Sequence, residues 1–288
     1  MRLALGTAQF GMNYGIANQI GQVNDVNVKA LLKLAYENQI NVLDTAIAYG
    51  ESESCLGRVK VDNFMIVSKL PALPIDCKNI YTWVFQEVQA SLDRLKVGHL
   101  YGLLLHHAMD LLSTHGAELY KALKLAQEKG LIQKVGVSIY SPNHLEELVR
   151  RYQLDLVQAP LNIFDQRIIY SGWLHRLKAQ GVEVHTRSVF LQGLLLMNKQ
   201  SIPLYFSAWQ KLFAKWYEFL EGENISPLQA CLALPAAYEE IDHVLVGVED
   251  KTQLTDIFNA VGKVSTMDLS AFASNDENLI NPYLWNYV

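Results

Sequence analysis

Short apolar runs alternate along the chain with longer segments in which apolar residues recur at helical spacing. Eight of the runs are expected to form strands, at residues 2–5, 42–44, 64–68, 100–105, 134–137, 154–158, 182–186 and 244–246. Most of them read as continuous apolar stretches rather than as an alternation of apolar and polar positions. This is typical of parallel strands that are buried on both faces.

The segments between these runs carry the periodicity of amphipathic helices. Val84, Val88, Leu92 and Leu95 line one face of a long one. Further helices are expected after a cap at Asn24 or Asp25, at 52–59, around 119–126, from Ser141-Pro142, before Gly181, at 226–238 and at 252–261. Strand and helix thus alternate eight times, which predicts an α/β fold of the (β/α)8, or TIM, barrel type.

Two segments lie outside this minimal pattern. Residues 203–222 are rich in aromatic side chains and are expected to form an extra helix that packs on the outside of the barrel. Residues 269–288 are expected to form a C-terminal tail over the barrel mouth. We find no internal repeat, low-complexity tract or linker, so a single domain over residues 1–288 is expected.

Composition and charge narrow the classes of function. Half of the 288 residues are hydrophobic, which is enough for a substantial core. The net charge of −5, without a basic run, argues against a nucleic-acid partner, and no apolar stretch approaches the ~18 residues of a membrane span. The N-terminus enters a strand without a signal-peptide pattern, and the three cysteines have no metal-binding spacing. We therefore expect a cytoplasmic protein.

Ionisable side chains stand at the ends of three successive predicted strands. Asp44 ends the second strand, Lys69 follows the third and His106 follows the fourth, while Tyr49 lies in the loop after Asp44. Each alone has an ordinary explanation, as a helix cap, a solvated rim residue, a backbone hydrogen-bond partner or an aromatic loop residue. Catalytic residues of barrel enzymes gather at the carboxyl ends of strands, and neighbouring strands are ~5 Å apart. We therefore expect the four side chains to converge.

Motifs along almost the whole chain resemble the aldo-keto reductase family. The matching stretches are 5–11, 43–46 with Tyr49-Gly50, Ser68-Lys69, 104–106, 130–132 with 136–138, 157–158 and 192–194. The resemblance places the family's catalytic aspartate, tyrosine, lysine and histidine at Asp44, Tyr49, Lys69 and His106. It implies an oxidoreductase that uses NAD(P)H to reduce the carbonyl of a small aldehyde, ketone or sugar.

The resemblance also implies a role for each of the four residues. The cofactor supplies the hydride, and Tyr49 gives the developing alkoxide its proton. A free phenol has a pKa of ~10 and is a weak acid at neutral pH. Lys69 is expected to lower the pKa of Tyr49, Asp44 to hold the ammonium of Lys69, and His106 to orient the carbonyl oxygen.

Cofactor contacts are implied by the same resemblance. The matching residues are Gly6 and Thr7 at the first strand end, Ser138 and Gln158 at the nicotinamide carboxamide, Ser188, Gln192 and Gly193 in the pyrophosphate loop, and Gly247 at the adenosine end. Ile139 stands where the family usually has an asparagine, which removes one hydrogen bond to the carboxamide.

Two cofactor positions depart from the family pattern. Arg187 replaces a tyrosine that stacks on the nicotinamide in many relatives, and its charge is expected to favour the reduced cofactor over the cationic oxidised form. Glu249 stands where relatives that use NADP have a basic residue, so it is expected to repel a 2′-phosphate, whereas nearby Lys251 is able to attract one. The choice between NADH and NADPH stays open.

Substrate contacts in this family come from loops and the tail. Here these contacts are expected from Phe10, Tyr14, His107 and Trp285. His185, within the seventh predicted strand, is expected to be a core histidine with its hydrogen bonds satisfied. We predict no metal site, because no group of His, Cys and carboxylate residues has metal-ligand spacing.

Two other functions fit part of the pattern. Potassium-channel β subunits share the barrel and the cofactor but act chiefly as regulatory partners, and the aromatic segment 203–222 is able to serve such a partner. The complete set of four catalytic positions favours an enzyme, since a pure binding protein needs no tuned acid. A barrel enzyme that uses Lys69 as a Schiff-base amine leaves Tyr49 and the phosphate loop unexplained.

Overall fold

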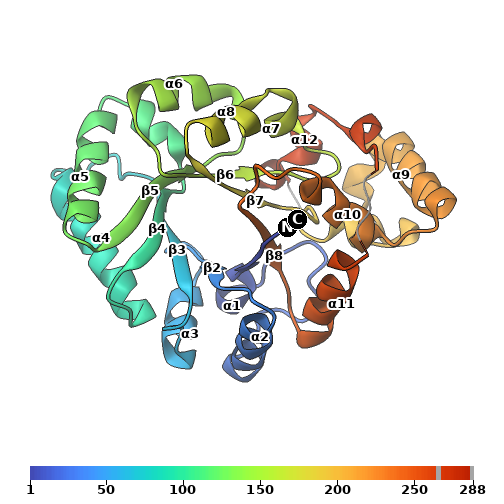
Figure 1. Cartoon of the computed structure of the whole chain (residues 1–288), viewed down its shortest axis with the longest axis horizontal. Coiled ribbons are helices and arrows are strands. Elements are labelled where there is room, and N and C mark those ends of the chain that lie inside the picture. Colours follow the sequence, from blue (N-terminus) through green and yellow to red (C-terminus); the bar gives the residue numbers. More distant parts are fainter. Residues whose placement is uncertain (264–266, 286–288) are drawn as a thin grey trace.

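Eight parallel strands close into a barrel in the order in which they occur in the chain (Figure 1). The structure is a computed structural model that describes residues 1–263 and 267–285. The strands are β1 (Leu3–Gly6), β2 (Val42–Asp44), β3 (Met65–Leu70), β4 (Leu100–Leu105), β5 (Ile132–Ser138), β6 (Leu156–Pro160), β7 (Glu183–Arg187) and β8 (His243–Gly247). The predicted (β/α)8 barrel is confirmed.

Helices surround the barrel on its outside (Figure 1). The α-helices are α1 (Ala8–Gly11), α2 (Asp25–Glu37), α3 (Ser52–Val59), α4 (Ile80–Leu95), α5 (Gly116–Glu128), α6 (Leu145–Arg151), α7 (Arg167–Tyr170), α8 (Trp173–Ala179), α9 (Gln210–Glu223), α10 (Pro227–Ala236), α11 (Lys251–Val261) and α12 (Glu277–Ile280). Short 3-10 turns lie between them, at Ala108–Leu112, Pro142–His144, Leu194–Leu196, Lys199–Ser201, Leu204–Trp209, Ser270–Phe272 and Pro282–Leu284.

The sequence pattern located these elements with small errors at their ends. β3 and β7 extend one or two residues further than predicted, so that Lys69 lies within β3 rather than after it. The four-residue helix α1 was not predicted, because four residues show no helical period. The segment before Gly181 forms two short helices, α7 and α8, with Gly172 in the left-handed region between them.

Strand register fixes which side chains point into the barrel. Ala4, Val42, Val67, Leu104, Leu156 and Leu245 form one apolar cluster, one residue from each of six strands. Side chains two positions apart on a strand share a face. Leu156 pairs with Glu183, and Gln158 pairs with His185, so the inward face of β7 carries Glu183, His185 and Arg187. The barrel interior is therefore apolar in its middle and polar at both ends.

The aromatic segment 203–222 packs within the chain. Phe206, Phe213 and Trp216 are almost completely buried, and Phe206 contacts Trp285 of the C-terminal tail, with ring centroids 5.0 Å apart. Trp216 contacts Phe272, also in the tail. The prediction of an extra helix packed on the barrel is confirmed, and the segment holds the tail in place.

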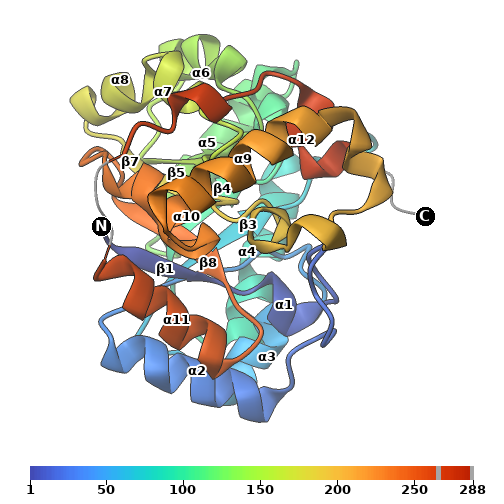
Figure 2. The ribbon, with the colours of Figure 1, turned by 90° about the vertical axis from the view of Figure 1, so that its right-hand side faces the viewer.

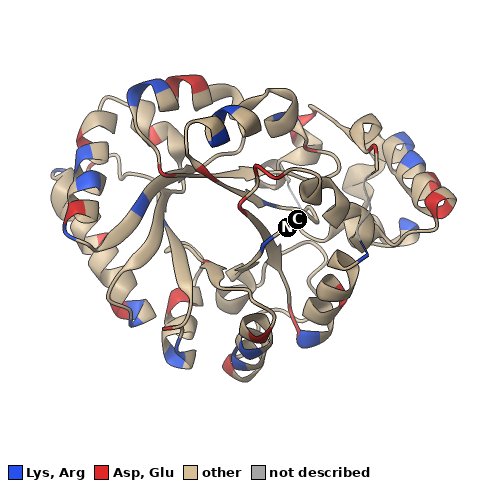
Figure 3. Ribbon diagram, in the orientation of Figure 1, with Lys and Arg blue, Asp and Glu red and all other residues tan. Residues whose placement is uncertain are grey.

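The tail lies on the side where the strands end, as predicted. In Figure 2, β1 runs from the N-terminus towards α1, and α12 lies on the α1 side of the molecule. Residues 286–288 of the predicted tail lie outside the described residues. Charged residues occur mainly on the outer helices and loops (Figure 3). Among the described residues, no helix is both long and apolar enough to cross a membrane.

Candidate active site

Asp44 and Lys69 form a buried ion pair between the ends of β2 and β3. The Nζ of Lys69 lies 2.6 Å from Oδ2 of Asp44 and donates a second hydrogen bond to the carbonyl of Thr45 at 2.8 Å. The Lys69 side chain is fully buried and that of Asp44 is 5% exposed. Asp44 pairs with Val67 and Lys69 with Leu104, and both partners belong to the inward-facing apolar cluster. Strand register therefore brings the two charges together inside the barrel.

Tyr49 and His106 complete the predicted group of four. The Nζ of Lys69 lies 5.0 Å from the centroid of the Tyr49 ring, and the rings of Tyr49 and His106 meet edge to face with centroids 5.7 Å apart. Two glycines position the loop that carries Tyr49. Gly50 has a φ of +55°, and a Cβ on Gly11 would lie 1.9 Å from the carbonyl oxygen of Tyr49. Convergence of the four side chains follows from this loop and from three adjacent strands.

The pKa of Tyr49 is raised, not lowered as the sequence comparison implied. Burial of the phenol is the largest cause, the Asp44 carboxylate adds to it, and Arg187 opposes both. Asp44 neutralises the ammonium of Lys69 at 2.6 Å, so the pair acts on Tyr49 with little net charge. Tyr49 therefore keeps its proton throughout the neutral pH range.

The two basic members of the site are also perturbed by burial. Burial lowers the pKa of Lys69, and Asp44 opposes this effect. Burial, together with the positive charges of Lys69 and Arg187, lowers the pKa of His106 to about 4. His106 is therefore a neutral imidazole at pH 7, able to donate one N–H hydrogen bond.

A cavity of about 910 Å³ opens above these residues at the carboxyl ends of the strands. Of the residues predicted from the sequence, its lining includes Gly6, Thr7, Tyr14, Asp44, Tyr49, His106, Arg187, Ser188, Gln192, Gly193, Gly247 and Glu249. Pro282 and Tyr283 of the tail also line it. A volume of this size suits a cofactor-sized organic molecule.

The loop after β7 has the backbone shape of an anion site. Ser188, Leu191, Gln192 and Gly193 all have positive φ, and a Cβ on Gly193 would lie 2.5 Å from that of Ala17. In the described part of the chain, the N–H groups of Gln192 and Phe190 donate to no backbone carbonyl. Free N–H groups in such a turn are able to bind phosphate.

Arg187 projects into the cavity at the end of β7. Its guanidinium donates hydrogen bonds to the carbonyl of Ile139 at 3.0 Å and to Oγ of Ser188 at 3.2 Å. It also lies over the ring of Tyr140, 4.8 Å from the centroid. These contacts fix a positive charge beside the Tyr49 and His106 side chains.

Ser138 and Gln158 lie deeper in the barrel. Gln158 donates a 2.6 Å hydrogen bond from Nε2 to Oδ1 of Asp44, and Ser138 donates to Oε1 of Gln158 at 3.4 Å. Both side chains are buried, and neither lines the cavity. In this arrangement they orient the Asp44 carboxylate.

The far end of the cavity is acidic. Glu249, Gln253 and Asp256 line it, and Lys251 does not. The side chain of Asp250 caps α11 by accepting a hydrogen bond from the backbone N–H of Gln253. Burial raises the pKa of Glu249.

Three residues predicted to contact substrate lie away from the cavity. Phe10 is fully buried in the hydrophobic core because α1 turns its side chain inward. Trp285 packs on Phe206 and donates from Nε1 to the carbonyl of Leu279. His107 points to solvent, where its Nδ1 lies 2.7 Å from Asp110. The structure thus places these three side chains outside the cavity lining, because the positions of loop side chains cannot be read from a motif.

Tyr140 and Tyr283 were missed by the sequence analysis. Both line the cavity, and their ring centroids lie 6.1 Å apart. Tyr140 follows the end of β5, so an aromatic residue at a strand end was an available signal. Tyr283 lies in the tail, where the sequence pattern gave no such signal. Glu183, His185 and His243 meet at the opposite end of the barrel, although their positions in the sequence show no metal-ligand spacing; the expectation of no metal site stays a prediction.

The fold and this site define a (β/α)8-barrel protein with a buried lysine–aspartate pair beneath a phenol and an imidazole. Comparison with known families identifies the class. The family model described as "Aldo/keto reductase family" matches residues 2–277. The chain therefore belongs to the aldo/keto reductase family, as its motifs predicted.

Individual relatives are distant. The chain is 26% identical over 184 residues to the uncharacterized oxidoreductase YqkF of Bacillus subtilis, a match that covers 58% of this chain and 56% of that protein. It is 27% identical over 185 residues to the glyoxal reductase of the same organism, which covers 60% of each. The chain thus matches little more than half the length of these curated relatives.

A solved structure supports the fold. The aldo-keto reductase AKR11C1 from Bacillus halodurans, in its holo form, superposes with a TM-score of 0.75 at 18% identity. The superposition covers 99% of this chain and 95% of that one. At this level of identity the similarity bears on the fold alone.

Proposed function

We propose that this protein is an NAD(P)H-dependent oxidoreductase that reduces the carbonyl group of a small aldehyde, ketone or sugar to an alcohol. The observation that carries the proposal is the buried Lys69–Asp44 pair, 2.6 Å apart, in which Nζ of Lys69 lies 5.0 Å from the centroid of the Tyr49 ring and Asp44 lines the cavity. A buried ion pair is a costly arrangement that a purely structural barrel does not need. Its position beside a cavity-lining phenol gives it a chemical use.

The cavity residues fit a dinucleotide cofactor. Gly6, Gly193 and Gly247 line it without side chains, and a Cβ on Gly247 would lie 2.7 Å from Nε2 of Gln9. The loop around Gln192 offers free backbone N–H groups for a pyrophosphate, and Arg187 adds a positive charge. When bound, the cofactor would supply the hydride that reduces the substrate carbonyl.

Tyr49 is the proton donor in this proposal. Because its pKa is raised, it holds its proton at neutral pH until an alkoxide, a stronger base than phenolate, develops beside it. The phenolate left behind would face two cations, the guanidinium of Arg187 and the ammonium of Lys69, although Asp44 offsets most of the charge of Lys69. Asp44 keeps the ammonium in place, and Gln158 holds the Asp44 carboxylate.

His106 would orient the substrate. Its ring lies beside that of Tyr49, and as a neutral imidazole it has one N–H to donate to the carbonyl oxygen. A carbonyl oxygen held between Tyr49 and His106 would accept two hydrogen bonds that strengthen as negative charge develops.

Replacing Tyr49 tests the reaction. In a Tyr49→Phe variant, kcat for a panel of aldehydes, ketones and sugars should fall by about 10²–10⁴ while the Kd for reduced cofactor stays within about threefold. Tyr36→Phe is the control, because Tyr36 is an exposed phenol outside the cavity lining. Full turnover in Tyr49→Phe, or an equal loss of turnover in Tyr36→Phe, would contradict the assignment.

The acidic end of the cavity favours NADH over NADPH. Glu249 and Asp256 would repel a 2′-phosphate, and Asp250 already occupies the N-terminus of α11. We expect kcat/KM to be higher with NADH, and Glu249→Gln with Asp256→Asn to improve NADPH use by about tenfold or more. Glu118→Gln with Asp93→Asn, both exposed and outside the cavity lining, serves as the control with the same charge change. A wild-type preference for NADPH would refute this part of the proposal.

The regulatory alternative predicts a different outcome. A protein that only senses the cofactor would bind it and turn over none of the panel. The aromatic residues Phe206, Phe213 and Trp216 that suggested a partner surface are buried in this chain, which weakens that alternative.

A further inference from the structure

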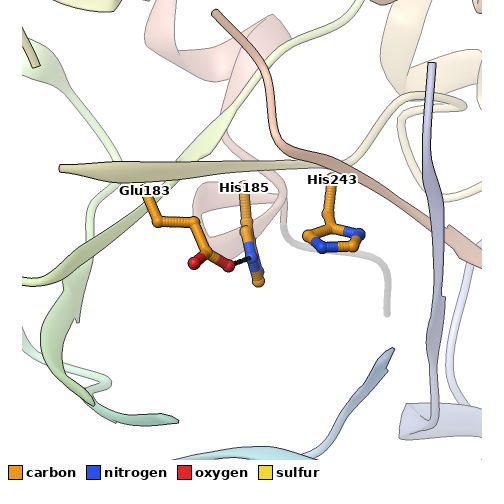
Figure 4. Close-up of side chains that lie close together, drawn as sticks. All are labelled: Glu183, His185 and His243. Atoms are coloured by element: carbon orange, nitrogen blue, oxygen red, sulfur yellow. Dashed lines mark hydrogen bonds and ion pairs between the residues drawn. The ribbon is translucent and has the colours of Figure 1, made fainter. Parts of the chain in front are cut away.

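A second group of ionisable side chains lies inside the barrel at the amino-terminal ends of the strands. Glu183 and His185 are two positions apart on β7, so they share its inward face. His243 begins β8, and strand register pairs it directly with His185. Figure 4 shows that the three side chains leave the two strands on the same side.

These side chains form a compact set of metal-binding donors. One donor atom from each of the three lies within 4.8 Å of the others. The two imidazole rings meet edge to face with centroids 4.9 Å apart, and Nε2 of His185 lies 2.6 Å from Oε1 of Glu183 (Figure 4). His185 is fully buried and His243 is 6% exposed.

Each histidine has one ring nitrogen that its surroundings do not satisfy. Nδ1 of His185 and Nδ1 of His243 are buried and have no hydrogen-bond partner among the described residues. The prediction that His185 is a satisfied core histidine is therefore only half right. Burying a polar atom without a partner costs about 1–3 kcal/mol, so two such atoms side by side need an explanation.

We propose that Glu183, His185 and His243 bind one divalent transition-metal ion, with Zn²⁺ the best match. Two imidazoles and one carboxylate are a donor set that Zn²⁺ accepts in proteins, with water in the fourth position. A hard ion such as Mg²⁺ or Ca²⁺ is disfavoured, because two of the three ligands are nitrogens. The proposal does not depend on the reductase function proposed above.

The existing geometry needs only side-chain adjustment to hold the ion. Tetrahedral Zn²⁺ with ligands at about 2.1 Å has its donors roughly 3.4 Å apart. The 2.6 Å contact between Glu183 and His185 must therefore open, and the widest separation of 4.8 Å or less must close.

Lys134 would compete with a metal ion for the carboxylate of Glu183. Its ammonium forms an ion pair with Oε2 of Glu183, to which the hydroxyl of Tyr101 also donates a hydrogen bond at 2.8 Å. The charge of Lys134 beside this carboxylate therefore limits the affinity of Glu183 for a metal.

The position of the site indicates a structural role. β7 and β8 are adjacent strands, so a shared ion would join the last strand to the rest of the barrel. The Tyr49 site lies at the opposite ends of the strands, where this fold keeps its catalytic groups. Metal binding should therefore change stability without changing the reaction at Tyr49.

Titration with a metal alone tests the proposal. Full-length protein treated with a chelator is titrated with ZnCl₂ by calorimetry and with CoCl₂ by visible absorption, whose d–d bands report tetrahedral nitrogen and oxygen ligation. We expect one ion per chain. His243→Gln and His185→Gln should each weaken binding by at least about 100-fold. His107→Gln, which removes an exposed histidine beside Asp110, should leave binding unchanged.

A variant that is expected to tighten metal binding distinguishes loss of the site from loss of folding. Lys134→Met should tighten metal binding by about tenfold, because Glu183 no longer shares its carboxylate with an ammonium. Lys33→Met, which removes an exposed ion pair with Glu37 on α2, is the control and should have no effect. The proposal is overturned by absence of binding in the wild type, by binding that His107→Gln abolishes, or by Lys134→Met failing to tighten it.

Discussion

The ion pair between Lys69 and Asp44 allows stability and catalysis to be separated in one experiment. The two charges are 2.6 Å apart and almost inaccessible to solvent. At an effective dielectric constant of about 20, their attraction is roughly 6 kcal/mol, most of which is offset by the desolvation of both groups. Removing one partner leaves the other charge buried and uncompensated, which costs about 3–5 kcal/mol.

We therefore expect Lys69→Met and Asp44→Asn each to lower the free energy of unfolding by about 3–5 kcal/mol. The double variant should lose much less than the sum, because neither buried charge remains. A coupling energy of about 2 kcal/mol or more should appear in the double-mutant cycle. Urea unfolding followed by tryptophan fluorescence measures it, since the chain has five tryptophans.

Turnover in the same three variants should behave differently. All three should lose kcat by about 10²–10⁴, because Lys69→Met and the double variant lack the ammonium near Tyr49 and Asp44→Asn lacks the carboxylate that holds it there. Recovered stability with abolished turnover in the double variant would establish that the pair serves the reaction and not the fold. Single effects that add within about 0.5 kcal/mol would refute the coupling, and normal turnover in the double variant would refute the role of Lys69.

Two further predictions concern the positive charge and the imidazole beside Tyr49. Arg187→Ala should reduce the preference for reduced over oxidised cofactor by about tenfold, because it removes a cation from the cavity. The preference is measured as the ratio of the two Kd values. Arg176→Ala, on the outer surface over Trp173, is the control and should leave this ratio unchanged. Because the pKa of His106 is about 4 in the folded protein and ~6.5 when unfolded, the unfolded chain binds more protons between these values. Stability should fall as the pH drops from about 6.5 to about 4, by about 1–2 kcal/mol for His106 after allowing for its partial exposure, and His106→Gln should flatten the curve by that amount.

The barrel was predictable from the sequence because each strand and most helices show their hydrophobic pattern within a short stretch of the chain. Each β-strand is a short apolar run and most helices carry a clear stripe, as Val84, Val88 and Leu92 do in α4, where all three are buried. The same locality explains what was missed. α1 has only four residues, too few to show a period, and the ends of β3 and β7 depend on strand pairing rather than on composition.

The site was predictable where strand ends determine it. Asp44, Lys69 and His106 were found because adjacent strands bring their ends together. Side chains on loops and in the tail could not be located in this way. Phe10 and Trp285 turned into the core, whereas Tyr140 and Tyr283 took the positions at the cavity. The raised pKa of Tyr49 was also beyond sequence, because it depends on how closely Asp44 neutralises Lys69 and on the degree of burial.

The two polar ends of the barrel are separated by an apolar layer. Six side chains, one from each of six strands, fill the middle: Ala4, Val42, Val67, Leu104, Leu156 and Leu245. On β7 the two polar ends are close together in the sequence: Glu183 and His185 lie at one end of the strand, and Arg187 lies at the other. Because the apolar layer separates the two ends, we expect the pH profile of turnover to be the same with and without bound Zn²⁺. A shift in that profile would contradict this expectation and show that the two ends communicate along β7.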